Sequence, residues 1–256
     1  MWRVCVLLLI SGLAHADTDS TPLRLSDVSA AEAFVESAEV VVIGFFKEDG
    51  GTGFQEFLSL ASDLRTVPFA LCSAPEVWQR YNISMDTVSL FRQTDSHQEK
   101  LQMEEGRKLE SDSLLRFVRM NELRYLTEYN AMTAVGLFSS SVQTHLLLFA
   151  DQRSEGFAAL QSSLAHLAPT YRGQLLFVLV DGATKSNSRS LSYFGLRSSD
   201  LPAVGLYDTK ADRKWLLPPG EVTTERVQQF CESFLSGELQ SQDSSESSTA
   251  ESKSEL

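Results

Sequence analysis

The chain has 256 residues, of which 43% are hydrophobic, 34 are acidic and 22 are basic. This is ordinary globular composition, and the length suits one large domain or two of about 100 residues each. The formal net charge is −12, and no basic stripe is present that could follow a phosphate backbone. The composition therefore argues against nucleic acid as a partner.

The first sixteen residues, MWRVCVLLLISGLAHA, predict a secretory signal peptide (residues 1–16). Arg3 precedes an apolar run from Val4 to Ala14, and Ala14 and Ala16 stand at the minus-three and minus-one positions of a cleavage site. The run is too short to span a bilayer of about 30 Å, and no later stretch is long enough, so we expect no membrane insertion. Cleavage leaves 21 basic and 34 acidic residues, a net charge of −13.

The other end, residues 241–256, is predicted to be a disordered acidic tail because it offers almost no apolar surface to bury. Its last four residues, Lys253, Ser254, Glu255 and Leu256, resemble the Lys-Asp-Glu-Leu signal that a retrieval receptor recognises. A signal peptide together with this tetrapeptide predicts residence in the endoplasmic reticulum lumen, with the retrieval receptor as a partner. The alternative is a secreted protein in which the tetrapeptide is ignored.

Between these ends, the first half alternates apolar strands with amphipathic helices. Ser29 and Glu32 form a capping box that opens a short helix. In chain order we then expect a strand at 40–46, a helix at 53–64, a strand at 67–72, a helix at 75–81, a strand at 87–92, an edge strand at 100–103 and a helix at 113–123.

The same order of elements returns from Met132. We expect a helix at 132–138, a strand at 145–149, a helix at 157–167, a strand at 175–180, a helix through residues 191 and 194, a strand at 203–207, a polar loop around Trp215 and a closing helix at 224–235. Two domains of equal length, 17–128 and 129–240, therefore follow, each with the order βαβαββα after a leading helix.

This order predicts an α/β protein of two tandem thioredoxin-like domains, each a mixed central sheet with helices on both faces. In that fold a proline, usually cis, opens the third strand beside the active-site turn. Pro202 stands in that place in the second half, whereas Asp86 or Thr87 stands there in the first.

Thioredoxin-like enzymes keep their reactive thiols where a strand delivers the chain to a helix N-terminus. The turn after the strand at 40–46 contains no cysteine. Cys5 is lost with the signal peptide, and Cys72 and Cys231 are predicted to be buried thiols that behave as small hydrophobic side chains. A weak redox or isomerase enzyme that uses Cys72 or Cys231 is the alternative.

No other catalytic or cofactor-binding pattern is present in the sequence. His97, His145 and His166 lack the paired spacing of metal ligands, so we expect no metal, no cofactor and no catalytic residue. Asn82 opens the sequence Asn-Ile-Ser at a helix-to-strand turn, which predicts an N-glycosylation site.

Several segments resemble the tandem non-catalytic b and b′ domains of the protein disulfide isomerase family. They are VVIGFF, YNISMDTVSLFR, LTEYNAMTAVGLF, THLLLF, GQLLFVLVDG, YFGLRSSDLPAVGLYD and FCESFLSGEL. The resemblance implies a non-enzymatic protein whose second, b′-type domain binds unfolded polypeptides in a hydrophobic pocket. The family's pocket-bearing segments match Phe138, Phe157, Leu164, Leu175 and Phe177.

The resemblance also implies a surface loop that recruits a catalytic disulfide isomerase of the glycoprotein-folding pathway (PDIA3-like). The family's acidic, Trp-containing loop motif falls on Asp212, Arg213, Lys214 and Trp215. Because the two middle residues are basic here, a basic partner surface would meet like charges at those positions.

Overall fold

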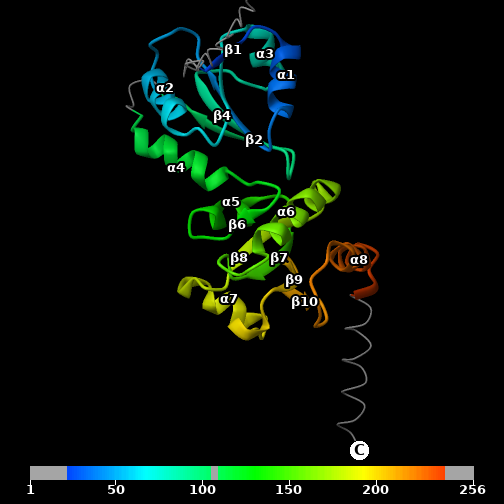
Figure 1. Ribbon diagram of the computed structural model, residues 1–256. Coiled ribbons are helices and arrows are strands. Elements are labelled where there is room, and N and C mark those ends of the chain that lie inside the picture. The colour runs from blue at the N-terminus through cyan, green and yellow to red at the C-terminus, as the bar shows by residue number, and fades with distance from the viewer. Residues whose placement is uncertain (1–21, 105–108, 240–256) are drawn as a thin grey trace, which may run out of the picture.

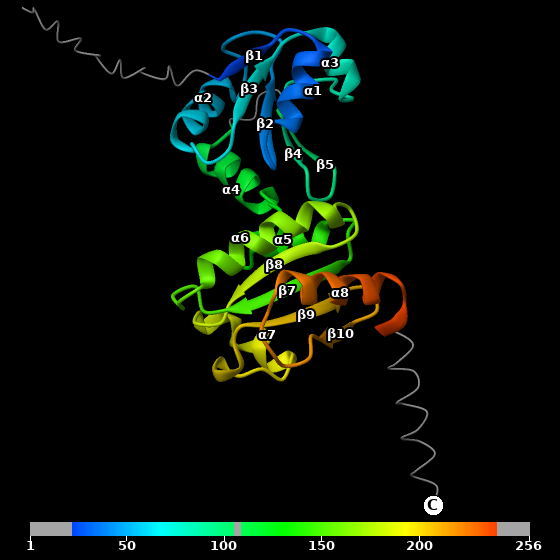
Figure 2. The same ribbon diagram turned by 45° about the vertical axis from the view of Figure 1, so that its right-hand side comes forward.

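The computed structural model describes residues 22–104 and 109–239, which form two sheets of five strands with helices packed against them (Figures 1 and 2). The predicted signal peptide and acidic tail lie outside the described residues. The expected α/β class with two tandem thioredoxin-like domains is confirmed.

The first sheet has the strand order β1-β3-β2-β4-β5. Strands β1, β3 and β2 run parallel, and β4 and β5 are antiparallel to their neighbours. Its elements are β1 (Leu23–Leu25), α1 (Val28–Glu36), β2 (Val40–Phe45), α2 (Phe54–Asp63), β3 (Phe69–Cys72), α3 (Pro75–Arg80), β4 (Thr87–Arg92), β5 (His97–Gln102) and α4 (Ser111–Asn121).

The second sheet has the strand order β6-β8-β7-β9-β10, which is equivalent to that of the first sheet. Strands β6, β8 and β7 run parallel, and β9 and β10 are antiparallel to their neighbours. Its elements are β6 (Thr127–Glu128), α5 (Thr133–Ser139), β7 (Thr144–Ala150), α6 (Phe157–Leu167), η1 (Ala168–Tyr171), β8 (Leu176–Asp181), η2 (Lys185–Asn187), α7 (Ser188–Tyr193), η3 (Ser198–Asp200), β9 (Ala203–Asp208), β10 (Arg213–Leu216) and α8 (Thr224–Leu235).

The two faces of the second sheet bury different sets of side chains, because successive residues of a strand point to opposite faces. Leu146 and Leu148 of β7 pack into a core beneath α6 and α8. Leu147 and Phe149 of the same strand join α5 and α7 on the other face. The α5 and α7 side is therefore a separate apolar layer from the core beneath α6 and α8.

The structure departs from the predicted elements at the start of each sheet. Strand β6 pairs with β8, so the second sheet begins at Thr127, before the predicted boundary at residue 129. Strand β1 was likewise missed. Both are very short, and tertiary pairing rather than a local pattern of alternation fixes them. Helix α1 is capped by Asp27, which accepts from the Ala30 N–H at 2.9 Å, and not by the predicted box at Ser29.

A buried polar network lies where the two domains meet. Arg92 pairs with Asp95 at 2.8 Å and donates to the carbonyl of Asn121, and the Ser140 hydroxyl of the second domain donates to Asp95 at 2.8 Å. Arg92 and Asp95 are both buried. Gly136 brings α5 close to α4, since a Cβ at this position would overlap the Met120 carbonyl oxygen. The junction is therefore a packed, satisfied interface.

Candidate functional site

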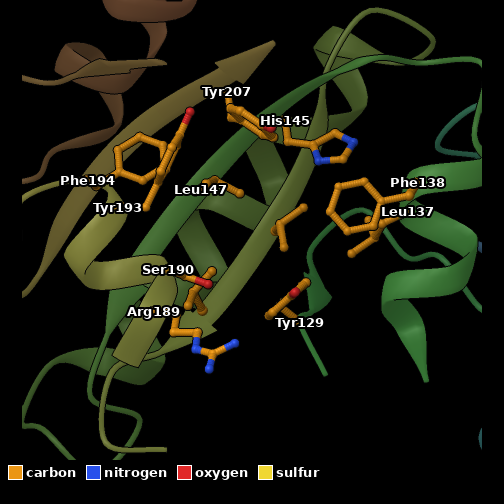
Figure 3. A pocket seen from close by; sticks show the side chains of 12 residues that line it. Tyr129, Leu137, Phe138, His145, Leu147, Arg189, Ser190, Tyr193, Phe194 and Tyr207 are labelled. Atoms are coloured by element: carbon orange, nitrogen blue, oxygen red, sulfur yellow. The ribbon is translucent and has the colours of Figure 1, made fainter. Parts of the chain in front are cut away.

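A cavity of about 350 Å³ opens on the α5 and α7 side of the second sheet (Figure 3). Most of its lining is aromatic or aliphatic. The lining residues are Tyr129, Leu137, Phe138, His145, Leu147, Val178, Val180, Arg189, Ser190, Tyr193, Phe194 and Tyr207.

Strand alternation and two short helices build this lining. His145 and Leu147 of β7, like Val178 and Val180 of β8, are two residues apart, so each pair presents the same face of the sheet to the cavity. Phe138 on α5 and Tyr193 on α7 are 56% and 42% exposed, which is unusual for large aromatic side chains. The cavity is thus an apolar floor with exposed aromatic side chains at its rim.

His145 is the buried titratable group of the cavity. Desolvation lowers its pKa from 6.5 to about 4, although hydrogen bonding to the backbone of Leu137 and Val142 acts in the opposite direction. The imidazole is therefore neutral at neutral pH. Its Nε2 atom is buried without a hydrogen-bond partner in the described structure, and its ring lies 5.9 Å from that of Phe138.

Asp212 holds two tyrosines of the lining. The hydroxyls of Tyr193 and Tyr207 both donate to its Oδ1 atom at 3.0 Å. Burial, and then the hydrogen bond to Asp212, raise the pKa of Tyr207 to about 12. The Lys214 ammonium lies 4.0 Å from the centre of the Tyr193 ring and donates to the Tyr193 carbonyl. The β9–β10 turn is therefore connected directly to the rim of the cavity.

Of the five residues that the sequence suggested for a pocket, Phe138 lines this cavity. The other four, Phe157, Leu164, Leu175 and Phe177, lie in the core beneath α6 and α8, on the opposite face of the sheet. The physical reason is the strand period: Phe177 points away from the face that Val178 and Val180 line. These four residues therefore do not line this cavity.

The predicted partner-binding segment is a turn and a strand rather than a loop. Asp212 is in the turn, with φ of 50°, and Arg213, Lys214 and Trp215 begin β10. Trp215 is buried, with its ring 5.1 Å from Phe234, and the Arg213 guanidinium lies 4.9 Å from the indole. Of the four residues, Trp215 is therefore mostly withdrawn from the surface.

Both cysteines of the described structure are buried free thiols in different domains. Burial raises the pKa of both, that of Cys231 to about 12. A thiol in this state is a poor nucleophile, because the thiolate is the reactive form. Within the described residues, no group of three His, Cys, Asp or Glu side chains could hold a metal ion.

Two further predictions concern surface features. Asn82 is exposed in the turn after α3 with φ of 53°, while the next residue, Ile83, is buried. Lys253, Ser254, Glu255 and Leu256 lie outside the described residues.

The Leu201–Pro202 peptide bond is cis, as the thioredoxin-like pattern led us to expect.

The sequence did not single out several residues that line the cavity, although strand alternation could have indicated some of them. Once Leu147 is placed on one face of β7, the period of two predicts that His145 faces the same way. Tyr129, Arg189 and Tyr193 had no local signal, since their positions depend on how loops and short helices pack.

The fold defines a two-domain thioredoxin-like protein in which each domain holds one buried free cysteine. A family model described as a thioredoxin-like domain matches residues 46–233. Endoplasmic reticulum resident protein 27 of Bos taurus is 40% identical over 216 residues, which cover 84% of this chain and 79% of that protein.

Protein disulfide-isomerase of Gallus gallus is 33% identical over 223 residues, which cover 87% of this chain and 42% of that protein. Among solved structures, the bb fragment of ERp72 is similar with a TM-score of 0.43 and 14% identity, covering 84% of this chain and 97% of that one. The chain belongs to the thioredoxin-like protein disulfide isomerase family, in its endoplasmic reticulum resident protein 27 group. The family resemblance of the sequence is thereby confirmed.

Proposed function

We propose that this protein is a non-enzymatic resident of the endoplasmic reticulum lumen that binds unfolded polypeptides in the cavity of its second domain. The observation that carries the proposal is the apolar cavity of about 350 Å³ with Phe138 and Tyr193 exposed at its rim. Unfolded chains display the apolar side chains that folded proteins bury, and a concave apolar surface can cover them without reading their order.

The size of the cavity supports weak and unselective binding of apolar side chains. Burial contributes about 25 cal/mol per Å² of apolar area. A few hundred Å² therefore supplies several kcal/mol before the loss of association entropy is subtracted. Micromolar or weaker affinity follows, which suits a protein that must release its clients.

The place of action follows from the relatives and the chain ends. The relatives in the resident protein 27 group are named as endoplasmic reticulum residents. The predicted signal peptide and the last four residues, which a retrieval receptor would bind, agree with that compartment. Among residues 22–104 and 109–239, no helix is long and apolar enough to cross a membrane.

Recruitment of a PDIA3-like disulfide isomerase is the second part of the proposal. Asp212 and Lys214 are the polar residues of the β9–β10 hairpin that hold Tyr193 at the rim of the cavity. A partner at this hairpin would stand next to a bound client. The partner surface should tolerate Lys214 and Arg213, which excludes a purely basic surface.

The competing function, an enzyme that uses Cys72 or Cys231, is disfavoured by burial of both thiols. Cys72 is the last residue of β3, just before the turn into α3, but its side chain is buried, and Cys231 is inside α8. Their raised pKa values keep them protonated at neutral pH.

The proposal is tested by titrating the mature chain with a labelled unfolded polypeptide and with the folded protein from which it derives. We expect saturable binding of the unfolded form alone. Phe138→Ala should weaken that binding about tenfold, because it removes an exposed aromatic contact. The matched control is Val135→Ala, an exposed position of the same helix that does not line the cavity. Equal binding of folded and unfolded forms would overturn the proposal.

A further inference from the structure

The lining of the cavity carries one formal charge, and that charge is positive. Of the twelve residues around the cavity, Arg189 is the only one that is ionised at neutral pH, and none is acidic. His145, the other basic side chain, is neutral there because burial lowers its pKa to about 4. The lining is therefore mostly apolar, with Arg189 as its one formal charge.

Arg189 differs from Arg153 and Arg197 in the same domain in having no acidic partner among the described residues. Arg153 pairs with Asp151, and Arg197 pairs with Asp200 in a capping box. Arg189 makes no hydrogen bond or ion pair with any residue that the structure describes, and it is exposed on the first turn of α7. Its five N–H donors are thus available to a ligand.

The charge lies at one end of the cavity. In Figure 3, Arg189 is well separated from Tyr207, whose hydroxyl, like that of Tyr193, is held by Asp212. At the tyrosine end the Asp212 carboxylate and the Lys214 ammonium lie close to the same ring and largely offset each other, whereas the Arg189 guanidinium at the other end attracts a ligand carboxylate. The charge of the site is therefore asymmetric, and a bound segment would lie with its acidic group at the Arg189 end.

The dimensions limit what can enter. About 350 Å³ is at the lower end of the range of ligand pockets, so there is room for one or two side chains of an extended segment and not for a folded element. A guanidinium next to apolar surface pairs well with a carboxylate, which it can bind through two parallel hydrogen bonds.

We propose that Arg189 makes this cavity select extended polypeptide segments in which a carboxylate adjoins a large apolar residue. This inference rests on the proposed function, and it adds the chemistry of the client. The carboxylate comes from an Asp or Glu side chain or from a chain end, and both sources present the same group to the guanidinium. Because Arg189 is exposed, the preference over a neutral isostere is about three- to tenfold at low salt and smaller at high salt.

The test uses the mature chain and fluorescent ten-residue peptides with a Phe-Leu pair in a Gly/Ser background, with binding followed by anisotropy. Three amidated peptides place Asp, Asn or Lys beside the pair. Two further peptides carry the Phe-Leu pair at the C-terminus, as free acid or as amide. The first set reports the side-chain source of the carboxylate, and the second set reports the chain end.

We expect the Asp peptide to bind about three- to tenfold more tightly than the Asn peptide, and the Lys peptide to bind most weakly. Arg189→Gln should remove this order, and Arg189→Glu should reverse it. The matched control is Lys185→Glu, which makes the same change of charge four residues earlier, at an exposed position that does not line the cavity. The control should keep the wild-type order.

The outcomes separate this inference from the proposed function. Suppose that the Asp peptide binds no better than the Asn peptide, and the free-acid peptide no better than the amide. Client binding then stands, and the role of Arg189 is refuted. If Arg189→Glu and Lys185→Glu change the order equally, a general field acts and the inference fails. If no peptide binds, neutral ones included, the proposed function itself fails.

Discussion

Replacement of His145 by Gln tests whether burial at the floor of the cavity lowers the pKa of this imidazole. The folded chain holds the imidazole at a pKa of about 4, and the ordinary value is 6.5. Between these two values the unfolded chain binds more protons than the folded chain, so stability falls as the pH falls through this interval. The full difference corresponds to about 3 kcal/mol, and acidification from about pH 7 to about pH 5 removes about 2 kcal/mol of it.

The assay is urea unfolding at several pH values, followed by circular dichroism. Carboxylates also contribute to acid unfolding, so the informative quantity is the difference in slope between wild type and variant. His145→Gln should lose about 2 kcal/mol of the pH-dependent fall between about pH 7 and about pH 5. His166→Gln, which removes an exposed imidazole on α6, is the control. Identical slopes for wild type and His145→Gln would refute the reasoning.

Four further variants test other parts of the structure. Asp95→Ala leaves Arg92 as a buried unpaired charge and should lower the free energy of unfolding by about 3–5 kcal/mol, measured by urea unfolding. Arg24→Ala, which breaks an exposed pair with Asp49, should lower the free energy of unfolding by less than about 1 kcal/mol. Equal losses for Asp95→Ala and Arg24→Ala would contradict burial of the Arg92–Asp95 pair at the domain junction. Asp212→Ala should lower the pKa of Tyr207 from about 12, visible in an ultraviolet titration, because one of the groups that raise it is lost. Cys231→Ala should not change the amount of thiol that reacts in the native state, and rapid native labelling of Cys231 would restore the enzyme alternative.

The elements that the sequence predicted well are those with a clear pattern of apolar residues. The strands at 87–92 and 203–207 agree closely with β4 and β9, because short segments rich in apolar residues between turns favour buried strands. The closing helix at 224–235 matches α8, where Thr223 caps the start and Gly237 follows the end. Local signals therefore determined the longer elements and their order, whereas the short strands β1 and β6 depend on tertiary pairing.

The candidate site was predicted less well, because it depends on which face of the second sheet carries the cavity. Phe177 and Val178 are adjacent, apolar and both buried, and only the packing of the helices decides that Phe177 faces α6 and α8 while Val178 faces the cavity. Arg189 lies on a helix of six residues that has no strong hydrophobic period. Its role depends on Tyr193 and Tyr207 across the cavity, which no local pattern reveals.

The most direct test of the client-binding site is a nuclear magnetic resonance titration of the isotope-labelled mature chain with an unfolded peptide. The account predicts shifts of the methyl groups of Leu147, Val178 and Val180, which face the cavity, with Leu146 and Leu164 unchanged on the opposite face. Shifts confined to Leu146 and Leu164, or no shifts at saturating peptide, would contradict it.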